Sequence, residues 1–136
     1  MTIDEQQVRT ALKRFFGFAD FRPGQRETIE ATLAGKPTLA VLPTGAGKTL
    51  LYQLPGVMLD GLVVVIAPLI SLMQDQVNRL RSDGLGPVAS LNSSLDYQEQ
   101  QWVLSHLGEL KFLFTSPETL LKPAVLRALH RQPISL

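Results

Sequence analysis

Residues 38–49, Thr-Leu-Ala-Val-Leu-Pro-Thr-Gly-Ala-Gly-Lys-Thr, constrain the fold more than any other stretch of this 136-residue chain. Residues 38–42 are apolar and partly β-branched, which predicts a buried strand of a parallel sheet. The remaining residues form a glycine-containing turn, and they lead into the apolar residues 50–54, which predict a helix. A strand, a glycine turn and a helix in this order are typical of a phosphate-binding loop.

The residue types in the turn fit the chemistry of phosphate binding. Gly45 and Gly47 let the backbone approach an anion closely, and the following helix N-terminus directs N–H groups at phosphate oxygens. Lys48 is predicted to reach the β- and γ-phosphates, and the Thr49 hydroxyl to bind Mg²⁺. The strict pattern has glycine where this chain has Leu42, so the prediction depends on the core of the motif and its context. We expect the phosphate-binding residues to be Pro43, Thr44, Gly45, Ala46, Gly47, Lys48 and Thr49, with Lys48 and Thr49 catalytic.

Composition narrows the class of protein. A hydrophobic content of 45% is enough for the core of one modest domain, and a net charge of +1 gives no strong field toward nucleic acid or membrane. The absence of cysteine excludes disulfides, thiolate zinc sites and cysteine nucleophiles. No apolar run is long enough to span a bilayer, and the polar, acidic start is unlike a signal peptide, so we expect a cytoplasmic protein without a membrane partner.

Helical and strand patterns alternate along the chain. Helices are predicted before Gly17 and between Pro23 and Gly35, and buried strands at residues 62–67, 87–91 and 111–115 with helices between them. Residues 133–136 look like the opening of one more strand. This alternation predicts an α/β fold with a parallel sheet flanked by helices.

Ligands of such folds bind beyond the carboxyl ends of the strands, so we expect residues 67–71, 91–94 and 115–118 to be functional beside the phosphate turn. These segments carry hydroxyls and amides but few cations, which suits a sugar-phosphate backbone that is held without base readout. The alternative is that these three segments are only the N-caps of the helices that follow them, with no ligand-binding role.

Some local features predict structure only. Thr2 and Glu5 predict a capping box at the first helix, and residues 92–94 predict the cap of a later helix. Tyr97 and Trp102 are interpreted as packing residues rather than stacking platforms.

A base could be held just upstream of the phosphate turn. The ring of Phe18 and the guanidinium plane of Arg22 could sandwich a purine. The amide of Gln25 could pair with N6 and N7 of adenine together. The alternative is that Phe18 and Phe21 are core residues and that Arg22 and Gln25 lie on the surface, which composition alone favours.

Residues 16–25, Phe-Gly-Phe-Ala-Asp-Phe-Arg-Pro-Gly-Gln, and residues 42–55 together resemble the start of a RecQ-family DNA helicase of superfamily 2. The resemblance implies a P-loop NTPase fold of the RecA-like type, with residues 16–25 as its adenine-recognition motif. Phe18 stands where the family often has tyrosine, whereas Arg22 and Gln25 match the motif. Ala46 and Thr49 replace a glycine and a serine that are often seen there, and both changes keep the chemistry.

The later loops resemble family motifs as well. Residues 67–76 are similar to the motif that touches single-stranded DNA, and residues 91–94 and 115–118 resemble further strand-contact motifs. Thr119 is a departure, because many relatives have arginine there. The resemblance implies DNA, single-stranded and duplex, as a partner, with the DNA-binding residues Pro68, Leu69, Ser71, Gln74, Asn92, Ser93, Ser116 and Pro117.

Hydrolysis of Mg-ATP normally needs one carboxylate on the metal and another to activate water, and no predicted strand ends in Asp or Glu. In the family, the strand that begins like residues 133–136 leads into an Asp-Glu-x-His box. We therefore expect a RecA-like sheet truncated before this Walker B strand, with N-terminal helices at residues 1–35 and a partial ATP-binding domain at residues 36–136.

The resulting hypothesis is an N-terminal part of an ATP-dependent 3′–5′ DNA helicase that uses ATP and Mg²⁺ and is inactive by itself. Its parent is expected to work with other DNA repair proteins, in the cytoplasm, and at the nucleoid in a bacterium. The alternatives are a nucleotide- or nucleic-acid-binding module without hydrolysis, a small P-loop kinase and an RNA helicase. A kinase should show a basic lid cluster, which we do not find, and nothing in these residues separates DNA from RNA through the 2′-hydroxyl.

Overall fold

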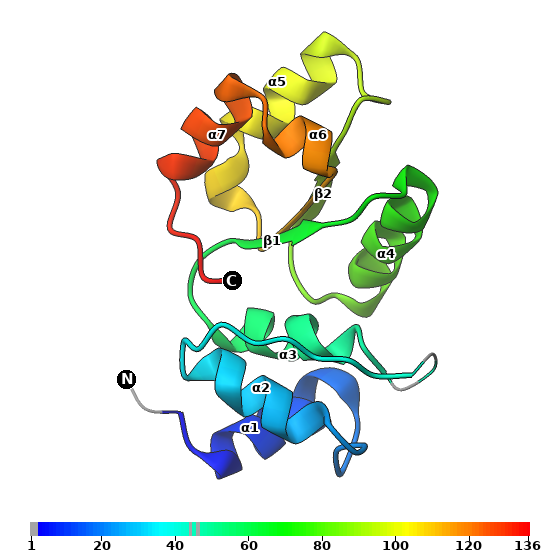
Figure 1. Ribbon diagram of the computed structural model, residues 1–136, viewed down its shortest axis with the longest axis vertical. Helices are drawn as coiled ribbons and strands as arrows, with labels where there is room; N and C mark the ends of the chain where they lie inside the picture. Colours follow the sequence, from blue (N-terminus) through cyan, green and yellow to red (C-terminus); the bar gives the residue numbers. More distant parts are fainter. Residues whose placement is uncertain (1–2, 44, 46) are drawn as a thin grey trace. The chain divides into compact units, whose positions relative to one another are not determined.

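The computed structural model describes residues 3–43, 45 and 47–136, and the chain divides into two compact units, Met1–Leu59 and Asp60–Leu136 (Figure 1). The described residues of the first unit form helices and loops, whereas the second unit contains the sheet. The predicted division into N-terminal helices at residues 1–35 and a partial ATP-binding domain at residues 36–136 stays a prediction.

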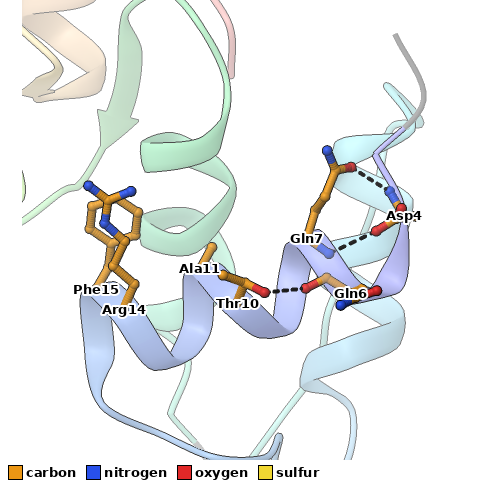
Figure 2. Close-up of a pocket in the computed structure, with 7 residues that line it drawn as sticks. All are labelled: Asp4, Gln6, Gln7, Thr10, Ala11, Arg14 and Phe15. Carbon is orange, nitrogen blue, oxygen red and sulfur yellow. Dashed lines mark hydrogen bonds between the residues drawn. The ribbon is translucent and has the colours of Figure 1, made fainter.

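The first unit begins with α1, Glu5–Ala11, which continues as a π-helical turn, Leu12–Phe16, and ends at Gly17 in the left-handed conformation. A capping box does start this helix, but it is built by Asp4 and Gln7 (Figure 2). The Asp4 carboxylate accepts the Gln7 N–H at 2.8 Å, and the Gln7 side chain accepts the Asp4 N–H at 2.9 Å. The predicted partner Glu5 is instead the first helical residue, so that prediction is wrong, and Thr2 lies outside the described residues.

Two further helices complete the first unit. Helix α2, Gln25–Leu33, follows the predicted turn at Pro23 and Gly24, and α3, Leu50–Met58, follows the phosphate turn as predicted. Their apolar faces pack with that of α1 around a small core, whose buried members are Val8, Ala11, Leu12, Ile29, Leu50 and Leu54.

The strand predicted at residues 38–42 does not form, and this prediction is wrong. These residues have no regular structure, and the side chains of Leu39 and Val41 are 89% and 84% exposed. A strand is stable only where a neighbouring strand satisfies its backbone N–H and C=O groups. Within the described residues, no such partner pairs with residues 38–42.

The second unit is built on a three-stranded parallel sheet of order β1-β3-β2, and this confirms the predicted α/β class. Its strands are β1, Val63–Ile66, β2, Val88–Leu91, and β3, Phe112–Thr115. The central strand β3 pairs in parallel with both neighbours, so that Phe112 stands beside Val63 on one side and Val88 on the other.

Helices cover both faces of this sheet (Figure 1). Helix α4, Ile70–Asp83, lies on one face, while α5, Tyr97–Ser105, and α7, Pro123–His130, lie on the other. A short 3₁₀ turn, Leu107–Glu109, precedes β3, and α6, Pro117–Leu120, follows it. Leu113 of β3 packs in the cluster with α5 and α7. Since successive strand residues face opposite sides, the fully buried Phe112 and Phe114 point toward α4.

Residues 133–136 lie along the edge of β1 that faces away from β3. Leu62 and Ile134 form an isolated parallel bridge, and the N–H of Val64 donates to the carbonyl of Leu136 at 2.9 Å. Residues 133–136, the predicted start of a further strand, therefore pair through their backbone with residues 62–64 at this edge.

Two predictions about the α5 region are wrong. The N-cap is Asp96, whose carboxylate accepts the Glu99 N–H at 2.8 Å, and not any of residues 92–94. Tyr97 and Trp102 are exposed rather than packed, and the Trp102 ring stacks on His106 with centroids 4.1 Å apart. Helix α5 buries Val103 instead, because a nine-residue helix presents only a narrow stripe to the sheet.

Candidate nucleotide site and sheet-edge loops

The phosphate turn has the backbone conformation that glycine permits. Gly45 and Gly47 have φ values of 83° and 77°, in the left-handed region. Lys48 and Thr49 follow with exposed side chains, and Thr49 stands at the N-cap of α3. The N–H groups of Leu51 and Tyr52 donate to the carbonyls of Lys48 and Thr49 at 3.1 and 3.3 Å, so an anion at this end of α3 would be met by the N–H groups that precede Leu51. Thr44 and Ala46 lie outside the described residues.

Two of the predicted adenine residues are hydrogen-bonded to this turn. The Arg22 guanidinium donates through Nη1 to the Gly45 carbonyl at 2.9 Å. The Gln25 amide donates through Nε2 to the Gly47 carbonyl at 3.1 Å, and its Oε1 accepts the Arg22 N–H at 2.9 Å. The structure thus brings together two motifs that are more than twenty residues apart in the sequence.

Glycine is required where these segments meet. A Cβ on Gly47 would collide with Nε2 of Gln25, so only glycine allows the amide to reach the turn. A Cβ on Gly24 would stand 2.8 Å from Cδ2 of Leu42. The sequence reasoning missed the second contact, although the Pro-Gly pair at residues 23 and 24 was a signal for a close approach.

The aromatic residues of the motif differ in burial. Phe18 is 52% exposed, whereas Phe21 packs against the core of the first unit. Arg22 is exposed, but Gln25 is only 4% exposed. The alternative that makes Phe18 and Phe21 core residues and Arg22 and Gln25 surface residues is therefore confirmed for Phe21 and Arg22 and wrong for Phe18 and Gln25.

The residues of the turn fit a triphosphate. Gly45 leaves open space beside the backbone, and Lys48 has no ion pair with any described residue. Thr49 supplies a hydroxyl that suits Mg²⁺. Among the described residues, no group of three or more His, Cys, Asp or Glu side chains could hold a metal ion.

A shallow hollow of about 400 Å³ lies along α1 and its π-helical extension, apart from the predicted site residues (Figure 2). The guanidinium of Arg14 stands over the ring of Phe15 at one end, 5.2 Å from its centroid. The hollow is lined by Asp4, Gln6, Gln7, Thr10, Ala11, Arg14 and Phe15.

The predicted DNA-facing loops gather at one edge of the sheet. Because β1, β2 and β3 are parallel, the segments after them leave the sheet at the same end. Most of the predicted contact residues are exposed there, namely Pro68, Leu69, Ser71, Gln74, Ser93 and Pro117.

Asn92 and Ser116 are buried in these loops, at 2% and 5% exposure. The Asn92 side chain accepts the Ser94 N–H at 2.9 Å and donates to the Met73 sulfur at 3.5 Å. The Ser116 hydroxyl accepts the N–H of the buried Thr119 at 3.2 Å and caps α6. Both side chains therefore shape the loops, and a nucleic-acid strand would meet their exposed neighbours.

Comparison with known proteins identifies the family. The family model for the DEAD/DEAH box helicases matches residues 22–133. The chain is 52% identical to the "Probable ATP-dependent DNA helicase RecS" of Bacillus subtilis over 96% of this chain and 26% of that protein. It is 44% identical to the "ATP-dependent DNA helicase RecQ" of Synechocystis over 98% of this chain and 28% of that protein.

The fold comparison agrees. A crystal structure described as a hypothetical ATP-dependent RNA helicase from Sulfolobus tokodaii matches with a TM-score of 0.65 and 25% identity, over 87% of this chain and 35% of that one. The chain belongs to the DEAD/DEAH box helicase family. Within that family its relatives are RecQ-type DNA helicases, which confirms the predicted resemblance and favours it over an RNA helicase. The chain spans about a quarter of the length of these two curated relatives. No helix in the described ranges is long and apolar enough to cross a membrane.

Proposed function

We propose that this chain binds Mg-ATP as part of the first motor domain of an ATP-dependent 3′–5′ DNA helicase of the RecQ type. The observation that carries the proposal is the direct bonding of Arg22 and Gln25 to the carbonyls of Gly45 and Gly47. Similarity to proteins named ATP-dependent DNA helicases supports it.

Each residue has a distinct proposed role. Phe18 and Arg22 hold the adenine ring between an aromatic face and a guanidinium plane. Gln25 pairs with the adenine edge through its amide, which also bonds to the Arg22 N–H and the Gly47 carbonyl.

The remaining roles concern the phosphates. The backbone N–H groups that follow Pro43, at residues 44–49, and the Lys48 ammonium bind phosphate oxygens, while the Thr49 hydroxyl is a ligand for Mg²⁺. When bound, Mg²⁺ neutralises charge that develops on the phosphoryl oxygens. Hydrolysis needs carboxylates, but the described strands end at Ile66, Leu91 and Thr115, so we propose binding without turnover by these residues alone.

The exposed residues of the sheet-edge loops are proposed to contact a DNA strand through its sugar-phosphate backbone. The buried side chains of Asn92 and Ser116 hold these loops in shape through their hydrogen bonds to Ser94 and Thr119. With a net charge of +1, the chain should bind DNA weakly and with strong salt sensitivity. We also propose that the parent protein works with DNA repair proteins in the compartment that holds the DNA, which in a bacterium is the cytoplasm and its nucleoid.

The test is a calorimetric titration of ATP into the wild-type chain and the Lys48→Ala variant. Loss of the ammonium should weaken ATP binding by about tenfold or more, because hydrogen bonds to charged groups contribute roughly 1.5–3 kcal/mol. Lys13→Ala is the matched control, since Lys13 is an exposed lysine outside the site. Equal ATP affinity in the wild-type and Lys48→Ala chains would contradict the proposal.

A further inference from the structure

A chain of ion pairs runs across the first unit and ends in the proposed adenine segment. Nη1 of Arg9 donates to Oδ1 of Asp20 at 3.1 Å, and Nε of Arg9 donates to Glu5 at 3.2 Å. The second oxygen of Glu5 pairs with Nη2 of Arg26 at 2.9 Å. Arg26 in turn donates through Nε to Glu30 at 3.0 Å. The network therefore joins three segments: the loop at residues 18–22, helix α1 and helix α2.

The network touches the adenine segment at two points. Asp20 lies midway in sequence between Phe18 and Arg22, and Arg26 directly follows Gln25. Residues 18–22 belong to no helix or strand, so side-chain bonds have to fix their course. The three proposed base-binding side chains are thus flanked by charges that converge on α1.

Asp20 performs two tasks with one carboxylate. Its Oδ1 accepts the N–H of Phe21 at 2.8 Å as well as the Arg9 guanidinium. The Phe21 N–H, and after it Arg9, hold the pKa of Asp20 below its ordinary value, so the carboxylate is charged at neutral pH. Glu5 and then Asp20 raise the pKa of Arg9 in the same way.

The plain alternative is that these are surface ion pairs with little effect. The Arg9 and Asp20 side chains are partly or largely exposed, and isolated pairs of this kind contribute little to stability. Their arrangement, however, affects the position of the loop at residues 18–22 more than the stability of the fold. A loop without regular structure is held against a helix at the residue between two base-binding side chains.

We propose that Arg9 and Asp20 are positioning residues for the adenine base, which rests on the nucleotide site proposed above. Arg9 holds the loop on α1, so that Phe18 and Arg22 stand at a fixed separation. Through Glu5 and Arg26, the same helix holds the first turn of α2, where Gln25 lies.

The experiment separates base recognition from phosphate binding. ATP, GTP and inorganic tripolyphosphate are titrated into the full chain and into Arg9→Gln and Asp20→Asn variants. We expect ATP binding to weaken by about three- to fivefold, which is the scale of one exposed charge pair. Tripolyphosphate affinity should stay unchanged, and the preference for ATP over GTP should narrow. The double variant should bind ATP no more weakly than the Arg9→Gln variant, since loss of Arg9 already removes its pair with Asp20.

Two further variants sharpen the result. Asp20→Asn keeps an acceptor for the Phe21 N–H, whereas Asp20→Ala removes it, so Asp20→Ala should lose more ATP affinity. Lys13→Gln is the matched control, because it removes a positive charge from the same helical segment outside the network. It should bind all three ligands as the wild type does.

The outcomes distinguish this proposal from the one on which it rests. ATP affinity that depends on Lys48 but is unaltered in both Arg9→Gln and Asp20→Asn overturns the positioning role alone. An equal loss of ATP and tripolyphosphate affinity, with a lowered thermal midpoint, also overturns it, because general destabilisation then explains the loss. A wild-type chain that binds no ATP overturns both proposals.

Discussion

The buried amide of Gln25 bonds to the backbone of the first unit, and it is also the proposed contact for the base. The amide oxygen accepts the Arg22 N–H and the amide nitrogen donates to the Gly47 carbonyl, so both ends of this 4%-exposed side chain are bonded to the backbone. A base that pairs with this amide, as proposed, would meet a side chain that is already bonded to the phosphate turn. The proposed pairing would therefore connect the conformation of the phosphate turn to the identity of the base.

Replacing Gln25 with alanine should remove base selectivity while leaving phosphate binding largely intact. An amide that pairs with adenine through two hydrogen bonds discriminates by roughly 1–3 kcal/mol, so the preference for ATP over GTP should fall by about fivefold or more. Competition titrations with both nucleotides measure this ratio. Gln101→Ala, an exposed glutamine on α5, is the control, and a Gln25→Ala ratio equal to that of the wild type would show the base assignment to be wrong.

A second residue-scale prediction concerns Gly47. Gly47→Ala and Gly35→Ala both place alanine in the left-handed region, at φ values of 77° and 76°, so each should lower stability by about 1 kcal/mol. Only the Cβ at residue 47 meets another residue, Nε2 of Gln25, whereas the space at residue 35 is open. Nucleotide affinity should therefore fall for Gly47→Ala and stay constant for Gly35→Ala. Equal affinities in the two variants would contradict the close approach of Gln25.

At the scale of elements, helix caps are the features that sequence patterns predicted least well. Residues 92–94 look like a cap, but Asn92 turns inward to close its own loop, and Asp96 takes the position before α5. An Asx-type turn and an N-cap use the same residue types, so the pattern alone does not separate them.

Asp96→Ala should therefore lower the free energy of unfolding by about 1 kcal/mol, the usual cost of losing a capping side chain. Ser93→Ala, three residues earlier and exposed, should change stability by less than about 0.5 kcal/mol. Urea unfolding of the two variants measures the difference. A larger loss of stability in Ser93→Ala than in Asp96→Ala would contradict this assignment and would favour the cap predicted at residues 92–94.

The sequence predicted elements whose signals are local. The strands β1, β2 and β3 and the helices between them were predicted because short apolar runs and glycine or proline boundaries identify them without reference to the rest of the chain. Residues 38–42 carry the same kind of signal, but a strand also needs a partner, which is a non-local condition. The contact between residues 22–25 and 45–47 is likewise non-local, and it became visible only in the structure.

At the scale of the whole molecule, exposed apolar side chains are the feature that most affects stability and self-association. Leu39 and Val41 are almost fully exposed on a β-prone segment whose backbone makes no strand pairing within the described residues. Exposed unpaired segments of this kind favour pairing with another chain. We therefore predict low stability or self-association when these 136 residues are made alone.

Lysine substitution tests the source of this association. A Leu39→Lys and Val41→Lys double variant should shift the chain toward monomer, because charges on an unpaired strand oppose edge pairing. Leu121→Lys, which charges an exposed leucine elsewhere, should have little effect. Sedimentation velocity over a range of concentrations measures the change. A wild-type monomer with a sharp, cooperative thermal transition would contradict the prediction.

The most direct test of the central claim is to measure ATP binding and ATP hydrolysis by this 136-residue chain together, with and without single-stranded DNA. The account predicts ATP binding that depends on Lys48 and Gln25, and no turnover under either condition. A chain that binds no ATP would contradict the nucleotide site itself. DNA-stimulated turnover would show that these residues supply their own metal carboxylate, with Asp75 and Glu118 as the first candidates, and would contradict the binding-only role.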